Sequence, residues 1–369
     1  MRSVTSLPKT DARVLIRVDY NVPLKGNRIL DARRIEASYE TIDVVLKKGA
    51  TPILIAHLAK GSDTLRPIAT FLSKRYKIVF ITADITDKKT QDIITNVPKR
   101  TVILLENIRR YPGEEKNTAS FTKALASYGE YYVNDAFSVS HRAHASVVGI
   151  SKLLPSYAGI QLVHEVKALT ISPKHPFLFL LGGAKFGTKI PLLTQYIQKA
   201  DHVVIAGAIL NDFYKVAGFE IGKSVAEKGF EAPIKKILNN PKLLLPVDVI
   251  VRRGTKSITV TPVEITKNDI IVDIGPQSIT LITSLIKKAK LVIWNGPTGW
   301  YEKGYTQGTI ELAKSVAKST AQTIIGGGDT SAVIENLAKS NKKIFVSTGG
   351  GATLEYLAKG TLVGIDFLK

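Results

Sequence analysis

The sequence predicts an α/β protein with mostly parallel sheets, divided into two domains. Apolar, β-branched runs recur along the 369 residues, and they are continuous rather than alternating, as expected for strands buried on both faces. Stretches with helical spacing separate most of these runs, which is typical of strand–helix–strand units. The chain is also longer than the roughly 250–300 residues at which a single core stops growing.

The predicted strands fall into two successive groups. The first group comes from the runs at 13–19, 51–58, 77–81, 101–107 and 131–135. The second group comes from the runs at 176–183, 202–208, 243–251, 291–296, 323–328 and 343–348. Helical spacing is clearest at 32–49, where Gly49 supplies a stop signal, and at 308–319. The segment 153–176, which contains three prolines, is expected to separate the two domains.

The formal net charge of +20 is distributed in a way that argues against a dedicated nucleic-acid surface. Residues 1–150 contain 24 Lys and Arg against 15 Asp and Glu, and residues 151–369 contain 27 against 16. Such an even excess predicts a lysine-rich solvated surface, with incidental attraction of RNA or lipid as the alternative. No apolar stretch approaches the ~20 residues of a membrane span, and the N-terminal segment has no signal-peptide region. The absence of cysteine excludes disulfides and thiolate metal sites and suits a cytoplasmic protein.

Arginine is concentrated in the first part of the chain. Of the 14 arginines, only Arg252 and Arg253 follow residue 150. Because a guanidinium group binds carboxylate and phosphate through two hydrogen bonds, this part of the chain is suited to a small acidic ligand. A drift in composition would give the same pattern, so both interpretations stay open.

Polar residues and glycines follow almost every predicted strand. Because ligands bind at the carboxyl ends of the strands in parallel sheets, these residues predict a site built from many loop ends. The residues concerned are Asp19, Asn21, His57, Asn107, Arg109, Asn134, Asp135, 182–185, Asn295, 326–328 and 349–351.

Two glycine triplets, 326–328 and 349–351, each lie between an apolar run and a helical pattern. Backbone N–H groups in such a turn, close to a helix N-terminus, can cradle phosphate oxygens. Asp329 directly follows the first triplet, where a carboxylate can hold a Mg²⁺ ion that shares those phosphates. The alternative is a pair of tight turns with no ligand.

Other nucleotide and metal signatures are incomplete. The segment 181–190 supplies a glycine turn with Lys185 and Lys189, which either neutralise phosphoryl charge or begin a solvated helix. No complete Walker A motif is present, and Ala206–Ala208 lacks the glycine spacing of a nicotinamide site. His141 and His144 could form a zinc pair, but no third ligand has suitable spacing.

The predicted anion-binding and phosphate-binding residues together favour phosphoryl transfer, a reaction in which positioning and charge neutralisation dominate catalysis. An arginine-rich anion site and a phosphate cradle are both predicted, whereas no general base is evident. A carboxylate acceptor is already ionised near pH 7 and needs no base.

Motifs along nearly the whole chain resemble those of phosphoglycerate kinases. The motifs that carry the resemblance are 17–23, 104–115, 133–146, 181–190, 222–224, 245–249, 273–278, 294–302, 326–330 and 347–357. The resemblance implies two Rossmann-like, three-layer domains joined by a hinge helix. It implies a 3-phosphoglycerate-binding domain at 1–158 plus 358–369 and a nucleotide-binding domain at 159–357. It also implies transfer of a phosphoryl group between 1,3-bisphosphoglycerate with ADP and 3-phosphoglycerate with ATP, in glycolysis and gluconeogenesis.

The resemblance also implies roles for individual residues. It implies that the catalytic groups are Arg34, Lys185 and the backbone N–H groups of Gly328 and Gly351. It implies 3-phosphoglycerate binding by Asp19, Asn21, Arg34, His57, Lys60, Arg109 and Arg142. It implies nucleotide binding by Gly182, Gly183, Lys189, Gly207, Asn295, Pro297, Gly299, Glu302, Gly327, Gly328, Asp329 and Thr330. Glu302 is expected to bind the ribose, and Asp329 is expected to bind Mg²⁺.

The chain departs from the family pattern at a few positions. Lys60 stands where the family usually has an arginine, and a lysine cannot make a bidentate fork. Ala206–Ala208 replaces a glycine triplet, and Trp300 replaces a smaller apolar residue.

The expected protein is cytoplasmic, acts on small molecules without specific nucleic-acid or membrane partners, and is a monomer, with a homodimer as the alternative. An RNA-binding relative without activity and a kinase for another carboxylate remain the competing hypotheses.

Overall fold

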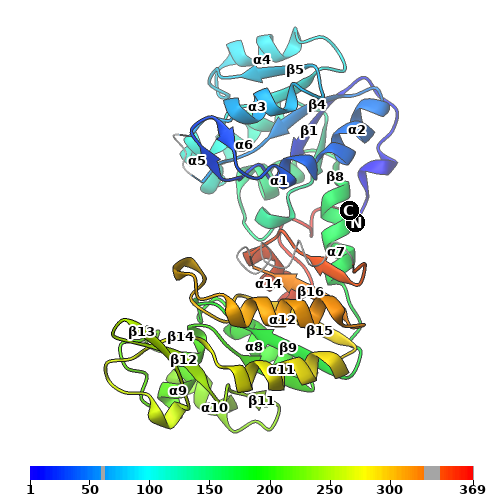
Figure 1. Cartoon of the computed structure of the whole chain (residues 1–369). Coiled ribbons are helices and arrows are strands. Elements are labelled where there is room, and N and C mark those ends of the chain that lie inside the picture. The colour runs from blue at the N-terminus through cyan, green and yellow to red at the C-terminus, as the bar shows by residue number, and fades with distance from the viewer. Residues whose placement is uncertain (60–62, 328–340, 369) are drawn as a thin grey trace. The chain divides into compact units, whose positions relative to one another are not determined.

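A computed structural model describes residues 1–59, 63–327 and 341–368 (Figure 1). The chain forms two compact units, Met1–Lys167 with Lys359–Lys369 and Ala168–Ala358. The C-terminal segment belongs to the first unit, where Arg2 N donates to Leu368 O at 3.3 Å and Asn134 Nδ2 donates to Gly364 O at 3.1 Å. The division falls near the end of helix α7 (Ile160–Leu169), and the domain boundaries expected from the sequence stay a prediction.

The first unit contains a parallel sheet with the strand order β5-β6-β4-β1-β7-β8. Its strands are β1 (Arg13–Arg17), β4 (Thr51–Ile55), β5 (Ile78–Ile81), β6 (Val102–Leu105), β7 (Tyr131–Asn134) and β8 (Ser156–Ala158). Leu15 and Ile16, which point to opposite faces of β1, are both fully buried. Burial on both faces explains why these strands read as continuous apolar runs. Strand β8 was not expected, because it lies within the segment interpreted as a domain boundary.

Helices alternate with these strands. They are α1 (Arg33–Glu36), α2 (Tyr39–Lys47), α3 (Arg66–Leu72), α4 (Lys88–Thr95), α5 (Pro112–Glu115), α6 (Ala119–Ala126) and α7. The single helix predicted over 32–49 is wrong, because α1 and α2 are separate. Between them, the buried Ser38 hydroxyl donates to Ile35 O at 2.7 Å and contacts Tyr20 Oη at 2.9 Å. Such side-chain bonds to the backbone compete with helix continuation.

The second unit contains a parallel sheet with the order β11-β10-β9-β15-β16-β17. Its strands are β9 (Phe177–Leu181), β10 (His202–Ile205), β11 (Leu243–Leu244), β15 (Leu291–Asn295), β16 (Gln322–Gly326) and β17 (Ile344–Val346). The fully buried Trp294 lies in a core cluster with Leu180 and Ile325 from the neighbouring strands. Two parallel-sheet α/β units are therefore present, which confirms the predicted fold class.

A small antiparallel sheet was not predicted. It has the order β13-β12-β14 and consists of β12 (Val249–Arg253), β13 (Lys256–Val260) and β14 (Ile270–Ile274). The run at 243–251 is therefore two strands in different sheets, which corrects the single strand expected there. Pro246 has no N–H for a ladder, and the Asp248 carboxylate accepts from Gln277 N and Ser278 N, so the chain leaves the parallel sheet here. A two-stranded hairpin of β2 (Leu24–Lys25) and β3 (Arg28–Ile29) in the first unit was also missed.

The helices of the second unit complete its core. They are α8 (Ile190–Lys199), α9 (Ile209–Val216), α10 (Glu231–Leu238), α11 (Pro276–Lys288), α12 (Gln307–Lys318) and α14 (Gly351–Lys359). Helices α11 and α12 lie side by side against the sheet (Figure 1), where Ile286 and Leu312 join the same core cluster as Trp294. The helix predicted at 308–319 corresponds to α12. Within the described ranges, no helix has both the length and the apolar character needed to cross a membrane.

Candidate functional site

In the first unit, the predicted anion-binding residues gather at the carboxyl edge of the sheet. Asp19 and Asn21 follow β1, His57 follows β4, and Arg109 lies in a short helix, Ile108–Arg110, after β6. Arg142 lies in the loop after β7. Because β6, β4, β1 and β7 are successive neighbours in one parallel sheet, residues far apart in the sequence share one edge. Lys60 lies outside the described residues.

Asp19 orients Arg34, which comes from helix α1. Arg34 Nη1 lies 3.0 Å from Asp19 Oδ2 and donates to Asn21 O at 3.3 Å. The Ser138 hydroxyl donates to the same Asp19 oxygen at 2.6 Å, and Asn21 N donates to Asp19 Oδ1 at 3.2 Å. The Arg34 side chain is nevertheless 33% exposed. A guanidinium that is fixed in direction and still reachable from solvent suits contact with an anionic ligand.

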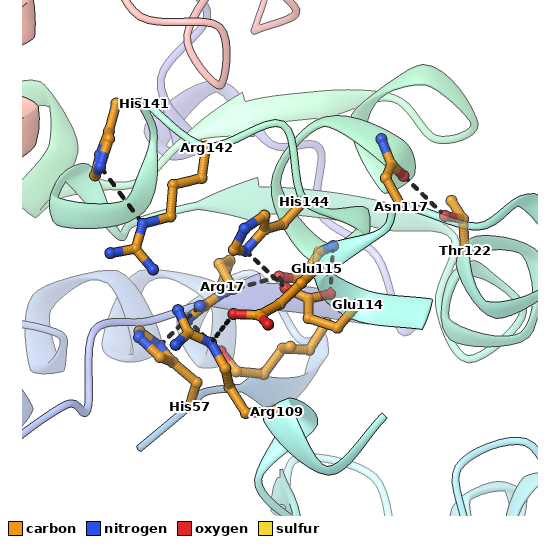
Figure 2. Close-up of polar contacts among 12 residues, drawn as sticks. Arg17, His57, Arg109, Glu114, Glu115, Asn117, Thr122, His141, Arg142 and His144 are labelled. Carbon is orange, nitrogen blue, oxygen red and sulfur yellow. Dashed lines mark hydrogen bonds and ion pairs between the residues drawn. The ribbon is translucent and has the colours of Figure 1, made fainter. Parts of the chain in front are cut away.

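His57 is buried among positive charges. Arg17 Nη2 lies 2.9 Å from His57 Nδ1 (Figure 2). Burial and then the charges of Arg17, Arg109 and Arg142 hold the pKa of His57 far below its usual value. The imidazole is therefore neutral near pH 7, and it can donate a hydrogen bond without adding a charge.

Arg34, Arg109 and Arg142 form what we call the cationic surface of the first unit, and Figure 2 shows the last two. Arg109 Nε lies 3.2 Å from Glu115 Oε1, while Arg109 Nη2 is buried and has no hydrogen-bond partner among the described residues. Burial, followed by the charge of Arg109, lowers the pKa of Arg142. The guanidinium groups of Arg109 and Arg142 therefore repel each other in the free protein, and an anion bound between them would relieve that repulsion. A buried guanidinium nitrogen without a partner is the clearest sign of a missing ligand oxygen.

Sequence reasoning did not single out four residues that support this surface. They are Arg17, Glu114, Ser138 and Ser146. Glu114 is 1% exposed and accepts from both Ser146 N at 2.9 Å and Ser146 Oγ at 2.6 Å. The only signal in the sequence is Arg17 at the end of an otherwise apolar strand, because a buried charge there requires a partner.

The zinc interpretation of His141 and His144 gains no support. The described part of the chain contains no group of three or more His, Cys, Asp or Glu that could hold a metal. His144 instead lies beside Glu114, with Nδ1 3.8 Å from Oε1, and Arg142 Nε lies 3.4 Å from His141 Nε2. Burial, then the charges of Arg109 and Arg142, lower the pKa of His144 to about 4.

In the second unit, the predicted phosphate-binding residues also lie at the carboxyl edge of the sheet. Gly182 and Gly183 follow β9, Gly207 follows β10, and Pro297 and Gly299 follow Asn295 at the end of β15. Gly327 follows β16, Gly351 is the first residue of α14, and Glu302 lies on an exposed turn beyond Gly299. Gly328, Asp329 and Thr330, including the proposed metal ligand, lie outside the described residues.

Glycines allow these loops to contact one another closely. Gly182 N donates to Asn295 O at 2.7 Å, Gly183 N to Pro297 O at 2.8 Å, and Gly207 N to Thr298 O at 3.0 Å. A Cβ added at Gly182 would lie 2.3 Å from Pro297 O, and one at Gly207 would lie 2.4 Å from Gly183 N. Real Cβ atoms essentially never come this close to backbone atoms, so these positions require glycine for packing between the loops.

We expect Gly207→Ala to destabilise the second unit more than Gly218→Ala does. Both glycines have positive φ, at +66° and +91°, but a Cβ at Gly218 would meet nothing within 4 Å. The control substitution should therefore cost only the ~1–2 kcal/mol of left-handed backbone strain. Gly207→Ala should cost a further ~1–3 kcal/mol, because the loop after β10 must move away from the loops after β9 and β15. Urea unfolding of both variants measures the difference, and equal losses would contradict the packing argument.

The two lysines of segment 181–190 lie in different surroundings. Lys185 is exposed, whereas Lys189 is 7% exposed and its Nζ donates to Gly182 O. Burial lowers the pKa of Lys189 to about 8, which the charge of Glu227 partly opposes. The buried Lys189 ammonium bonds the neutral Gly182 carbonyl, at the edge of the sheet where phosphates are expected, and a phosphate there would balance its charge.

Comparisons with known proteins converge on one family. The family model described as phosphoglycerate kinase matches residues 4–360. The phosphoglycerate kinase of Bartonella quintana is 39% identical over 392 residues, covering 100% of this chain and 99% of that protein. The phosphoglycerate kinase of Dictyoglomus turgidum is 41% identical over 378 residues, covering 97% of this chain and 95% of that protein.

Solved structures give the same result. The structure of phosphoglycerate kinase from Coxiella burnetii matches with a TM-score of 0.84 and 34% identity, covering 99% of this chain and 97% of that one. The crystal structure of phosphoglycerate kinase from Pyrococcus horikoshii matches with a TM-score of 0.86 and 26% identity, covering 100% of this chain and 98% of that one.

Proposed function

Since this chain belongs to the phosphoglycerate kinase family, we propose which of its own residues bind each substrate and which act in catalysis. The chain is a phosphotransferase of glycolysis with a carboxyl acceptor, and ATP and ADP are its co-substrates. The transfer runs reversibly between 1,3-bisphosphoglycerate with ADP and 3-phosphoglycerate with ATP. The proposed domains are 1–158 with 358–369 for the acceptor and 159–357 for the nucleotide.

The acceptor is proposed to bind the cationic surface of the first unit. Its ligands are Asp19, Asn21, Arg34, His57, Lys60, Arg109 and Arg142. The observation that carries this proposal is the buried Nη2 of Arg109, which has no hydrogen-bond partner in the part of the chain that the structure describes, together with the nearby charge of Arg142 and the neutral His57. A carboxylate or phosphate oxygen supplies the missing acceptor there, because guanidinium groups carry donors only.

The nucleotide is proposed to bind the loops of the second unit. The residues are Gly182, Gly183, Lys189, Gly207, Asn295, Pro297, Gly299, Glu302, Gly327, Gly328, Asp329 and Thr330. Support comes from the buried ammonium of Lys189 and from the exposed Glu302, which can accept from ribose hydroxyls. Mg²⁺ usually keeps several waters and takes one or two carboxylates together with substrate phosphates, so Asp329 suffices as its protein ligand. When bound, Mg²⁺ would neutralise charge on the phosphates.

Catalysis is proposed to depend on neutralising the transferring phosphoryl group. The acceptor carboxylate is ionised at pH 7, so no side chain has to remove a proton. Arg34 contributes a guanidinium whose direction Asp19 fixes, and Lys185 contributes an exposed ammonium. The backbone N–H groups of Gly328 and Gly351 complete the set. Fixed donors aimed at developing charge are usually the largest catalytic contribution in a reaction of this kind.

The reaction can be tested directly. ADP production is measured with 3-phosphoglycerate and Mg²⁺, in parallel with ATP and with GTP, and 3-phosphoglycerate is omitted as the control. Turnover that needs the acceptor supports the proposal, and the two nucleotides report base preference. A folded protein that shows no turnover with either nucleotide would refute it. Activity only with a different carboxylate would instead indicate that Lys60, which cannot make the bidentate contact of the family's arginine, changes the choice of acceptor.

Nucleotide binding at pH 8.5 should be accompanied by proton uptake. The pKa of Lys189 is about 8 in the free protein, so at pH 8.5 the side chain is neutral in a large fraction of the molecules. A nearby phosphate favours the ammonium and raises this pKa, and the protein must then take up a proton. Calorimetric titration with ADP in buffers of different ionisation enthalpy measures the uptake. Lys189→Met should abolish it while Lys185→Met keeps it, and the same uptake in both variants would contradict this role.

We further propose a cytoplasmic monomer that acts without specific nucleic-acid partners. Support comes from the small-molecule substrates of the family and from the even spread of the +20 charge. Light scattering measures the mass in solution. Strong retention on heparin at high salt would count against the absence of a nucleic-acid partner.

A further inference from the structure

Arg17 is buried at the end of β1, beside His57 of the proposed acceptor site. Its side chain is 1% exposed, so it does not offer its guanidinium to solvent. Its Nε donates to Ser146 Oγ at 2.9 Å, and its Nη1 donates to Val18 O at 2.5 Å. Its Nη2 lies 2.9 Å from His57 Nδ1. All three guanidinium nitrogens are thus engaged inside the protein.

The chemistry of these groups fixes the direction of each hydrogen bond. A guanidinium has donors only, so the Nδ1 of His57 must be the acceptor and carries no hydrogen. A neutral imidazole then holds its single hydrogen on Nε2. On the other side of Arg17, the Ser146 hydroxyl accepts a hydrogen bond from Nε and donates one to Glu114 Oε1 at 2.6 Å. Arg17 therefore donates to His57 on one side and to Ser146 on the other, and Ser146 in turn donates to Glu114. Figure 2 shows Arg17, His57 and Glu114.

The charges around His57 keep this arrangement stable. Arg17, Arg109, Arg142 and His144 each disfavour the protonated ring, in addition to its burial. The acidic groups nearby are already engaged, since Glu115 pairs with Arg109 and Glu114 accepts from Ser146. His57 therefore stays neutral over the range in which an ordinary histidine would titrate.

We propose that Arg17 is a positioning residue that fixes the tautomer of His57, so that Nε2–H donates to an anionic oxygen of the acceptor substrate. This proposal rests on the proposed function for the presence of that substrate. A neutral donor provides directional recognition without adding another positive charge to a surface that already holds Arg34, Arg109 and Arg142. It also makes this contact independent of pH, unlike a contact made by a titrating histidine.

The tautomer can be observed directly by nitrogen NMR of the full-length protein labelled with ¹⁵N-histidine. The His57 signals are assigned by their loss in His57→Gln, and spectra are recorded between pH 5.5 and 8. The wild-type ring is expected to carry hydrogen only on Nε2 and to show no titration. In Arg17→Met, which has no donor, the single ring hydrogen should move to Nδ1 in part of the molecules. Arg17→Lys, which keeps a donor, should restore the wild-type pattern.

Kinetics provide a second readout. In Arg17→Met, KM for 3-phosphoglycerate should rise about tenfold at pH 8, the usual effect of losing an oriented hydrogen bond to a charged group, with kcat changed less. Arg17→Lys, which keeps a donor, should bring KM back close to the wild-type value.

Several outcomes would overturn the proposal. A wild-type His57 that carries hydrogen on Nδ1 or titrates between pH 5.5 and 8 rules it out, whether or not the enzyme is active. An unchanged tautomer in folded Arg17→Met also rules it out. If Arg17→Met does not fold, the wild-type and Arg17→Lys spectra test the proposal, and both must show hydrogen on Nε2 of His57 only. Inactive protein with the expected tautomer would reject the proposed function and leave the tautomer assignment intact.

Discussion

Replacing Arg34 with alanine is expected to lower kcat by about 100-fold or more, which corresponds to ~3 kcal/mol of lost transition-state stabilisation. The guanidinium is held by Asp19 and the Asn21 carbonyl while 33% of the side chain stays exposed. Its orientation is therefore set before the substrate arrives, and no reorganisation is needed during transfer. Steady-state rates at saturating 3-phosphoglycerate and ATP measure the loss.

The adjacent residue provides a matched control. Arg33 belongs to the same short helix, but its side chain is 52% exposed and pairs with Asp31 on the surface. Arg33→Ala should leave kcat within a factor of about two, because exposed ion pairs contribute little. If Arg34→Ala raised KM and left kcat unchanged, Arg34 would bind the ground state only, and the catalytic role would be wrong.

Replacing Glu114 with alanine is expected to destabilise the first unit by about 3 kcal/mol. Glu114 and Arg17 are both 1% exposed, and the hydroxyl of Ser146 connects them through hydrogen bonds of 2.6 and 2.9 Å. Without the carboxylate, Arg17 becomes a buried charge that lacks its nearest counter-charge, and the backbone N–H of Ser146 loses its acceptor. Thermal unfolding followed by far-ultraviolet circular dichroism and urea titration measure the change.

The neighbouring Glu115 provides a control that removes the same charge from an exposed position. Glu115 is 56% exposed and pairs with Arg109, so Glu115→Ala should change stability by less than ~1 kcal/mol. Both variants remove one carboxylate from the same helix, α5, which makes the comparison direct. Similar losses in the two variants would show that Arg17 does not depend on Glu114.

The sequence was sufficient for the parts of the fold that arise from local pattern. Strands β1, β4, β9 and β15 are largely apolar runs, and burial on both faces of a parallel sheet leaves few other interpretations of such runs. The antiparallel strand β13 was missed because its mostly exposed residues, from Lys256 to Val260, carry little hydrophobic signal. Ser38 and Asp248, which lie where predicted elements divide, make hydrogen bonds to distant residues that the local pattern does not reveal.

The sequence by itself determined which residues follow each strand, and thus that arginines, glycines and lysines would meet at the carboxyl edges of two sheets. Only the tertiary structure decided what those residues do to one another. Arg17 meets Ser146 across 129 positions of the chain, and Lys189 is buried while Lys185, four residues earlier, is exposed. Protonation states and hydrogen-bond directions depend on burial and on neighbouring charges within a few ångströms, and these arise when the chain folds.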